Sequence, residues 1–419
     1  MAKFLDILLS HAVNMDQTVS SLLIDADSPM GRSARIYDPR DFLVPAERIN
    51  MSDIRFTIPC TLLVLPTMKC ITNCCYCYAD REGFRGRPEF DLTFFTKLLR
   101  EMKKCGMETI DISGGDIFCR RDAFDLIECA FEEGMHIDIP TKYPLSKQQI
   151  EHLAKLGLSS IQISIDANRP EIIDMLVAKE PGYGMKILKT IDDLGEAGLQ
   201  VRTNTVLTPY NIHEAPNLAR YLAKKPHVFK SNFTCYERSL YWHNDSLFCC
   251  VEDISKFENE FNEIKAEFPH KKMNFDGALG NPYSGSQTER PDAFQKRILC
   301  TANRRGFVVL PDGRATICEE IYLHESFILG DLNRQSLMEI WSSPKALQLA
   351  RPEQGLVPDG PCKDCSDFSH CHEGRGRCVR ETLKAYGYTH IGRTRVVRGR
   401  RLEIEWDNKS KPSSQVNLY

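Results

Sequence analysis

The chain has 419 residues, of which 42% are hydrophobic and 26% are charged, a composition that is ordinary for a globular protein of about two domains. Its net charge of −3 provides no general attraction to nucleic acid or to anionic membranes, so neither is expected as a partner. Asp6 and His11 interrupt the N-terminal apolar stretch, and no later run reaches the ~18 apolar residues of a membrane span. We therefore expect a cytoplasmic protein.

Strands that alternate with helices are predicted from Thr61 onward. Short apolar or alternating runs predict strands at residues 61–66, 109–113, 135–140, 160–165, 198–207 and 227–234. Helices are predicted from Asp91, over 122–133 and from Ser146, which forms a capping box with Gln149. This order predicts an α/β fold, a partial (β/α)6 TIM-like barrel over residues 59–271, with functional residues at the carboxyl ends of its strands.

The rest of the chain divides by composition. Residues 1–58 form an N-terminal extension, and glycine, proline and serine predict a linker over 272–298. A second unit rich in cysteine follows at 299–386, and a basic tail occupies 387–419. The run of arginines at 393–401 is expected to be a solvated strand or hairpin, with a surface for an acidic peptide as the alternative.

Seventeen cysteines are the unusual feature of this composition. Disulfides are rare in a reducing compartment, and cysteine clusters in a long intracellular chain indicate metal or redox chemistry. The first cluster is Cys70-x3-Cys74-x2-Cys77, directly after the first predicted strand; Cys75 falls outside this spacing. Three thiolates on one loop can bind three corners of an iron–sulfur cubane and leave the fourth iron open. A zinc site, or three unrelated thiols, is the alternative.

The spacing of these three cysteines after a first strand resembles the signature of the radical S-adenosylmethionine (SAM) superfamily. The resemblance implies that a 4Fe–4S cluster binds SAM at its open iron. A one-electron reductant, such as flavodoxin or ferredoxin, then splits SAM into methionine and a 5′-deoxyadenosyl radical. That radical abstracts a hydrogen atom from the substrate.

Further motifs resemble the SAM contacts of this superfamily. Gly114-Gly115-Asp116 is similar to its Gly-Gly-Glu motif for the SAM amino group, with a carboxylate that is one methylene shorter. Ser164-Ile-Asp166 is similar to its Ser-x-Asp, and Lys179 stands near the usual arginine for the SAM carboxylate. The resemblance also implies contacts from Tyr76, Thr141 and Asn204. A turn, a helix cap or another structural role is the alternative for each of these residues.

The second cysteine unit resembles a SPASM domain, which binds up to two auxiliary 4Fe–4S clusters. Its cysteines are Cys300, Cys318, Cys362, Cys365, Cys371 and Cys378. Six thiolates do not provide two clusters with four ligands each. Either the last four cysteines hold one complete cluster, or two clusters exist with a non-cysteine ligand or an open iron. A structural zinc site is the alternative.

Proteins with this domain mostly act on peptide or protein side chains. The resemblance therefore implies a maturase of a ribosomally made peptide, forming a thioether or carbon–carbon crosslink. Alternatives are an anaerobic sulfatase-maturating enzyme that forms formylglycine, or a peptide epimerase with Cys235, Cys249 or Cys250 as hydrogen-atom donor. A non-catalytic iron–sulfur electron carrier, which needs no SAM pocket, is the alternative from a different class.

Overall fold

The computed structural model describes most of the barrel region and part of the C-terminal unit. The described residues are 55–56, 58–79, 82–237, 239–241, 244–277, 302–322, 324–350, 352–357, 362–366, 368–369, 379–380, 383, 388–389, 392–393, 395–397 and 401–403. Most of the expected N-terminal extension, most of the expected linker and most of the basic tail lie outside them.

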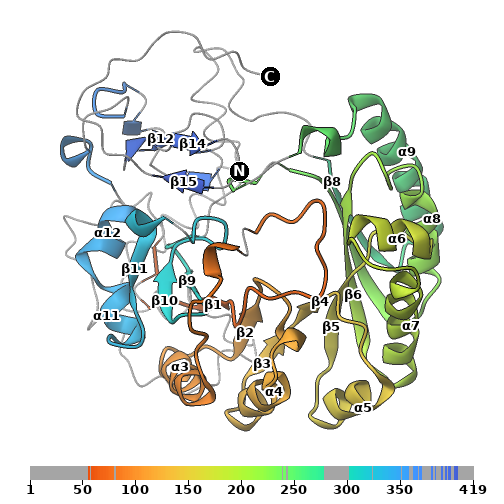
Figure 1. Cartoon of the computed structure of the whole chain (residues 1–419), viewed down its shortest axis with the longest axis horizontal. Helices are drawn as coiled ribbons and strands as arrows, with labels where there is room; N and C mark the ends of the chain where they lie inside the picture. Colours follow the sequence, from red (N-terminus) through yellow and green to blue (C-terminus); the bar gives the residue numbers. More distant parts are fainter. Residues whose placement is uncertain are drawn as a thin grey trace, which may run out of the picture.

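Strands and helices alternate from Thr61 to Asp276, as the sequence predicted. The strands are β1 (Thr61–Val64), β2 (Thr109–Ile112), β3 (His136–Asp138), β4 (Pro140–Thr141), β5 (Ser160–Ser164), β6 (Gln200–Leu207), β7 (Val228–Cys235) and β8 (Lys272–Asp276). The helices are α3 (Leu92–Lys104), α4 (Ala123–Glu132), α5 (Lys147–Lys155), α6 (Pro170–Leu176), α7 (Tyr183–Glu196), α8 (Ala215–Ala223) and α9 (Val251–Glu267). Figure 1 shows these helices on the outside of a curved wall of strands.

The wall consists of parallel strands from two sheets, which adjoin where β3 is followed by β4. β1, β2 and β3 pair in one sheet, and β4 to β8 pair in order in the other. The predicted strand at 135–140 is divided between them, because the chain passes from β3 to β4 at Ile139. The carbonyl oxygen of Ile139 still accepts a hydrogen bond from the Gln162 amide at 2.9 Å, so the two sheets remain connected at this point.

The linker boundary predicted at Lys272 is wrong. Residues 272–276 form β8, which pairs in parallel with β7 along its whole length. Met273 is buried, while Lys272 and Asn274 on either side are exposed, which is the alternation of a half-buried strand. The composition that suggested a linker begins only after this strand.

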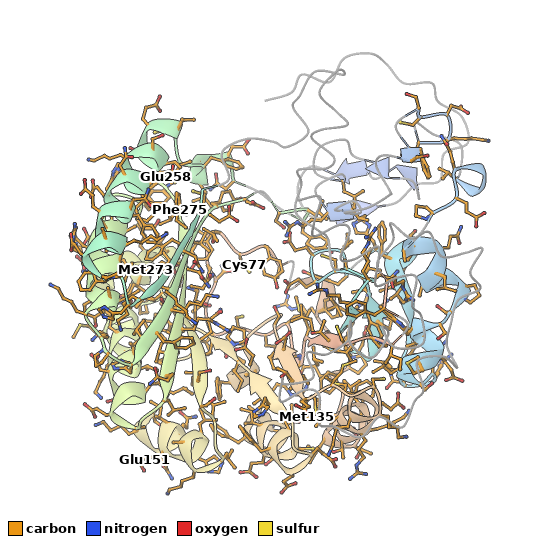
Figure 2. All side chains as sticks on the ribbon, turned by 180° about the vertical axis from the view of Figure 1, so that it is seen from behind. Cys77, Met135, Glu151, Glu258, Met273 and Phe275 are labelled. Carbon is orange, nitrogen blue, oxygen red and sulfur yellow. The ribbon has the colours of Figure 1, made fainter. Side chains whose placement is uncertain are left out.

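Helix caps and apolar faces follow the sequence. The Asp91 side chain accepts a hydrogen bond from the Phe94 amide at the start of α3, and Ser146 and Gln149 form the predicted capping box of α5. On β6, residues such as Val201 and Thr203 are buried, while Arg202 and Asn204 between them are partly exposed. The face of the sheet away from the helices is therefore polar, and Figure 2 shows Cys77 on this inner side.

The C-terminal unit extends the barrel sheet. Strand β9 (Gly306–Val309) pairs in parallel with β1, and β10 (Arg314–Thr316) and β11 (Ile328–Asp331) continue the sheet antiparallel. A Cβ at position 306 would lie 1.7 Å from the Thr61 carbonyl oxygen, so only glycine fits there. Trp341, at the end of α11 (Leu337–Trp341), is fully buried in the core that the two units share.

Two further features bear on the sequence predictions. β14 (Arg395–Val397) and β15 (Arg401–Glu403) form an antiparallel pair, which confirms a hairpin in the basic run. None of the helices in the described part of the chain combines the length and the apolar character that crossing a membrane requires.

Candidate active site

The cysteine loop lies at the carboxyl end of β1 and is held by the end of α6. The amides of Asn73 and Cys75 donate hydrogen bonds to the carbonyl oxygens of Val177 and Leu176, both at 2.9 Å. The last carbonyls of a helix have no partner within it, so this loop supplies donors that α6 needs. The loop that carries Cys70, Cys74 and Cys77 is thereby fixed between two βα units.

The three cysteines fit an iron–sulfur cluster by their chemistry and placement. Among the described residues, no three histidine, cysteine or carboxylate side chains already form a group that could hold a metal ion. All three thiols are nevertheless partly buried on one loop, and Cys74 shares one charged or polar neighbour with each of the other two. Cys74 and Cys70 help to raise the pKa of Tyr183, after burial, and Cys74 and Cys77 help to raise that of Lys142. Thiolates are the usual ligands of such clusters.

A buried ion pair lies beside this loop. The Lys142 ammonium is 2.8 Å from Oδ2 of Asp166, which also accepts a hydrogen bond from the Tyr76 hydroxyl, and the ammonium lies 5.4 Å from the centre of the Tyr76 ring. Burial alone would lower the pKa of Lys142, but Asp166 and Cys74 outweigh burial and raise it. Asp166 is 1% exposed, and Lys142 is its ion-pair partner in this position.

Asp116 is tied to the end of β4. Its Oδ2 accepts hydrogen bonds from the Thr141 hydroxyl at 2.8 Å and the Lys142 amide at 2.9 Å, and its Oδ1 accepts one from the Phe118 amide. Burial raises the pKa of Asp116, and the Thr141 hydrogen bond opposes the rise. The structure thus brings together Asp116, Thr141 and, through Lys142, Asp166. Their contacts with SAM remain predictions.

Gly114 and Gly115 are required by the packing of two loops. Gly114 has a positive φ of 92°, and a Cβ on Gly115 would lie 2.3 Å from the Lys69 carbonyl oxygen. The amides of Gly115 and Asp116 donate to the carbonyl oxygens of Thr67 and Lys69, both at 2.8 Å. The glycines therefore allow the turn after β2 to lie directly against the start of the cysteine loop.

Ser164 and Asn204 belong to a polar row across β5 to β8. The parallel register pairs Ser164 with Asn204, Asn204 with Asn232, and Asn232 with Asn274. The Asn274 amide donates to the Asn232 side-chain oxygen at 3.0 Å. Lys179, the predicted SAM carboxylate contact, follows α6 and is partly buried, and its role remains a prediction.

Sequence reasoning missed Lys142, which the structure places at the centre of this cluster. The signal was available, because a lysine directly after Thr141 stands at the carboxyl end of a predicted strand. The sequence did not identify its partner, because Asp166 follows β5 and meets Lys142 only through the pairing of β4 with β5.

The second cysteine unit is described only in part. Cys318, Cys362 and Cys365 lie among the described residues, whereas Cys300, Cys371 and Cys378 lie outside them. Burial, followed by the nearby carboxylates Glu320 and Glu319, raises the pKa of the Cys318 thiol to about 12. The charge of a bound metal ion would oppose this rise and favour the thiolate.

The predicted hydrogen-atom donors lie at the carboxyl end of β7. Cys235 is the last residue of β7, and Cys249 and Cys250 precede α9. The rings of Tyr236 and Phe248 are 5.2 Å apart, which places these two segments together. Burial, with Cys235 next, raises the pKa of Cys249 to about 12, whereas Cys250 is exposed. A donor role for any of them remains a prediction.

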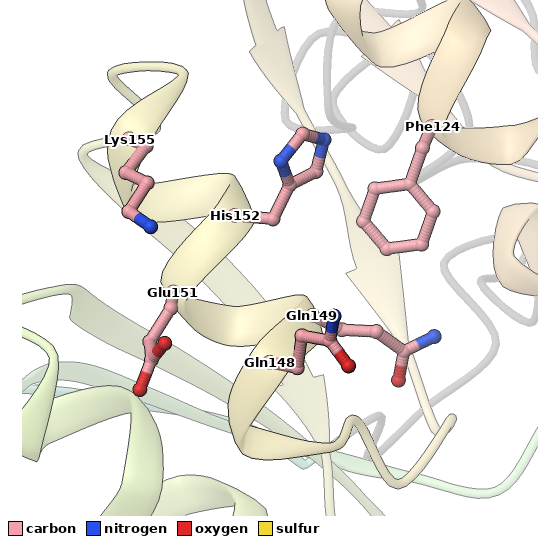
Figure 3. A pocket seen from close by; sticks show the side chains of 6 residues that line it. All are labelled: Phe124, Gln148, Gln149, Glu151, His152 and Lys155. Carbon is pink, nitrogen blue, oxygen red and sulfur yellow. The ribbon is translucent and has the colours of Figure 1, made fainter.

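A surface pocket elsewhere on the barrel is separate from this cluster. It lies over α5 on the helical side of the sheet and is lined by Phe124, Gln148, Gln149, Glu151, His152 and Lys155 (Figure 3). None of these residues belongs to the cysteine loop or to the strand ends around it, so the chemistry is not located there.

Together, the cysteine loop, the glycine turn and the ion pair form one site, and their residue types suit an enzyme that uses an iron–sulfur cluster and SAM. Comparison with known proteins agrees. Residues 64–222 match the model of the radical SAM superfamily, and residues 300–366 match the SPASM model, an iron–sulfur cluster-binding domain. The chain therefore carries a radical SAM domain followed by a C-terminal SPASM domain.

Relatives and solved structures are similar to this chain over most of its length. A PqqA peptide cyclase of Rhodopseudomonas palustris is 24% identical over 75% of this chain and 82% of its own length. The crystal structure of Streptococcus suis SuiB bound to precursor peptide SuiA has a TM-score of 0.63 at 15% identity, covering 92% of this chain and 87% of SuiB. Native anSMEcpe with bound SAM and the Kp18Cys peptide has a TM-score of 0.54 at 13% identity, covering 76% of this chain and 91% of anSMEcpe.

Proposed function

We propose that this protein modifies a ribosomally made peptide by radical SAM chemistry, forming a thioether or carbon–carbon crosslink. The observation that carries the proposal is the contact of Tyr76 and Lys142 with the buried Asp166 beside the three cysteines, at the carboxyl ends of parallel strands. The similarity to a PqqA peptide cyclase, and to a SuiB structure with a bound precursor peptide, supports a peptide substrate.

Each group in the cluster has a chemical task in this proposal. Cys70, Cys74 and Cys77 would hold the cluster, which would supply the one-electron chemistry that cleaves SAM. Lys142 presents a cation to the SAM carboxylate, and Asp166 holds the lysine in place. Asp116 fixes the end of β4 through Thr141, and these two residues would lie beside SAM when it binds. A one-electron reductant, such as flavodoxin or ferredoxin, supplies the electron in the cytoplasm.

The polar row on the inner face of the sheet is suited to a peptide backbone. Asn204, Asn232 and Asn274 carry side-chain amides that both donate and accept hydrogen bonds, as a peptide does. Crosslinking would transfer one hydrogen atom from the peptide to the 5′-deoxyadenosyl radical, which becomes 5′-deoxyadenosine. The second hydrogen would leave the peptide as a proton. The remaining electron needs an acceptor, and an auxiliary cluster in the SPASM domain supplies one.

The test is an anaerobic assay of the reconstituted full chain with SAM and dithionite, first alone and then with short peptides encoded beside its gene. We expect 5′-deoxyadenosine, and a peptide whose mass has fallen by two hydrogen atoms. The Cys70, Cys74 and Cys77 triple alanine variant should produce neither, and the iron it retains counts the auxiliary clusters. An unchanged peptide mass with inverted stereochemistry would indicate an epimerase. No 5′-deoxyadenosine from the wild type, with its clusters intact, would refute the proposal.

A further inference from the structure

One carboxylate connects the second cysteine unit to the loops of the barrel. Glu319 directly follows Cys318, and its Oε2 accepts hydrogen bonds from the Ser113 hydroxyl at 2.5 Å and the Tyr78 hydroxyl at 3.0 Å. The two hydroxyl oxygens are themselves 3.4 Å apart. Each of the three residues adjoins a motif: Tyr78 follows Cys77, and Ser113 precedes Gly114.

The neighbouring carboxylate points elsewhere, which makes the contact of Glu319 specific. Glu320 forms an ion pair with Arg380, which lies two residues after Cys378. Arg380 also lies 3.7 Å from Glu237, in the segment after β7. Glu319 therefore contacts residues beside the cysteine loop and the glycine turn, whereas Glu320 contacts Arg380.

The loops that Glu319 joins are already in close contact. The turn at Gly114 and Gly115 lies against Thr67–Lys69, with a Cβ at position 115 only 2.3 Å from the nearest backbone oxygen. A movement of either loop therefore moves the other. One oxygen that accepts from both Tyr78 and Ser113 sets the distance between the end of the cysteine motif and the beginning of the glycine motif.

We propose that Glu319 is a positioning residue that couples the auxiliary-cluster unit to the SAM site. Its Oε2 holds Tyr78 and Ser113, and through them it fixes Cys77 relative to Gly114–Asp116. This inference rests on the proposed SAM chemistry. It requires only an oxygen that accepts two hydrogen bonds, and not the negative charge of the carboxylate.

Two substitutions separate these requirements. Glu319→Gln keeps a side-chain oxygen that can accept from both hydroxyl groups but carries no charge, whereas Glu319→Ala removes the acceptor. Glu325→Gln is the matched control, because Glu325 lies in the same unit and its side chain is 73% exposed. Each full-length variant is reconstituted anaerobically, and its iron content, SAM dissociation constant and electron paramagnetic resonance spectrum with and without SAM are measured.

We expect Glu319→Ala to weaken SAM binding about tenfold, the effect of losing two hydrogen bonds, and to alter the change in spectrum that SAM produces. Its iron content should equal that of the wild type. Glu319→Gln should bind SAM within about threefold of the wild type and show the wild-type spectrum, as Glu325→Gln should.

Two results would overturn this role. One is equal loss of SAM binding in Glu319→Gln and Glu319→Ala, which would show that the charge is needed. The other is wild-type SAM binding in Glu319→Ala. If Glu319→Ala does not fold, Tyr78→Phe and Ser113→Ala each remove one donor and should each weaken SAM binding, and wild-type binding in both overturns the role. Failure of the wild type itself to bind SAM would refute the proposed function instead.

Discussion

The joint between the SPASM strands and the barrel can be tested at one glycine. Gly306 begins β9 and pairs with Thr61 of β1, and a Cβ there would lie 1.7 Å from the Thr61 carbonyl oxygen. Cβ atoms in real structures stay beyond 3.0 Å from such a neighbour. Gly306→Ala therefore forces β9 away from β1 by more than 1 Å.

The cost of this movement follows from the hydrogen bonds beside the glycine. The Cys60 amide donates to the Arg305 carbonyl oxygen at 2.7 Å, and the Leu65 amide to that of Val309 at 2.8 Å. Moving the strands apart by more than 1 Å breaks the backbone hydrogen bonds nearest the alanine. Each lost hydrogen bond lowers the free energy of unfolding by about 1 kcal/mol. With two or three bonds lost, we expect about 3 kcal/mol less stability and a melting temperature lower by about 6 °C.

Thermal unfolding followed by circular dichroism, at equal iron loading, measures this effect. The control is Gly355→Ala in η8 (Gln354–Leu356), where an added Cβ meets nothing within 4 Å. The control should melt within about 1 °C of the wild type, since surface substitutions usually change stability little. If Gly306→Ala melts with the control, the close approach of β9 to β1 does not stabilise the fold, and the reasoning fails.

Two further predictions concern ionisable side chains in the interior, Lys142 and His324. Lys142→Met leaves the buried Asp166 carboxylate without its cation. It should cost about 3 kcal/mol in urea unfolding and weaken SAM binding more than Lys179→Met does; equal effects of the two variants would contradict this. Burial lowers the pKa of His324 to about 4, so the unfolded chain, with a pKa near ~6.5, binds the extra proton first as the pH falls. The stability is complete above pH ~6.5 and should fall by about 2 kcal/mol between pH 7 and pH 5, and an equal fall in His324→Phe would exclude this histidine as the cause.

Local patterns predicted the elements well because local physics decides them. The capping box at Ser146 and the cap at Asp91 satisfy amides within the same turn, so they formed where the sequence placed them. The strand at 135–140 was predicted in place but not its division at Ile139, because that depends on how the two sheets meet. Strand β8 was missed because its alternation is short and adjoins a segment rich in glycine and serine.

The sequence by itself determined the class of chemistry. The spacing of Cys70, Cys74 and Cys77 after an apolar strand, and the later cysteines, required no knowledge of contacts, because ligands on one loop are close whatever the rest of the chain does. Only the tertiary structure decided which polar groups surround them. Lys142 meets Asp166, and Glu319 meets Ser113 across more than two hundred residues, because β4 adjoins β5 and β9 adjoins β1. Such pairs depend on the order of strands in the sheet, which the spacing of residues along the chain does not specify.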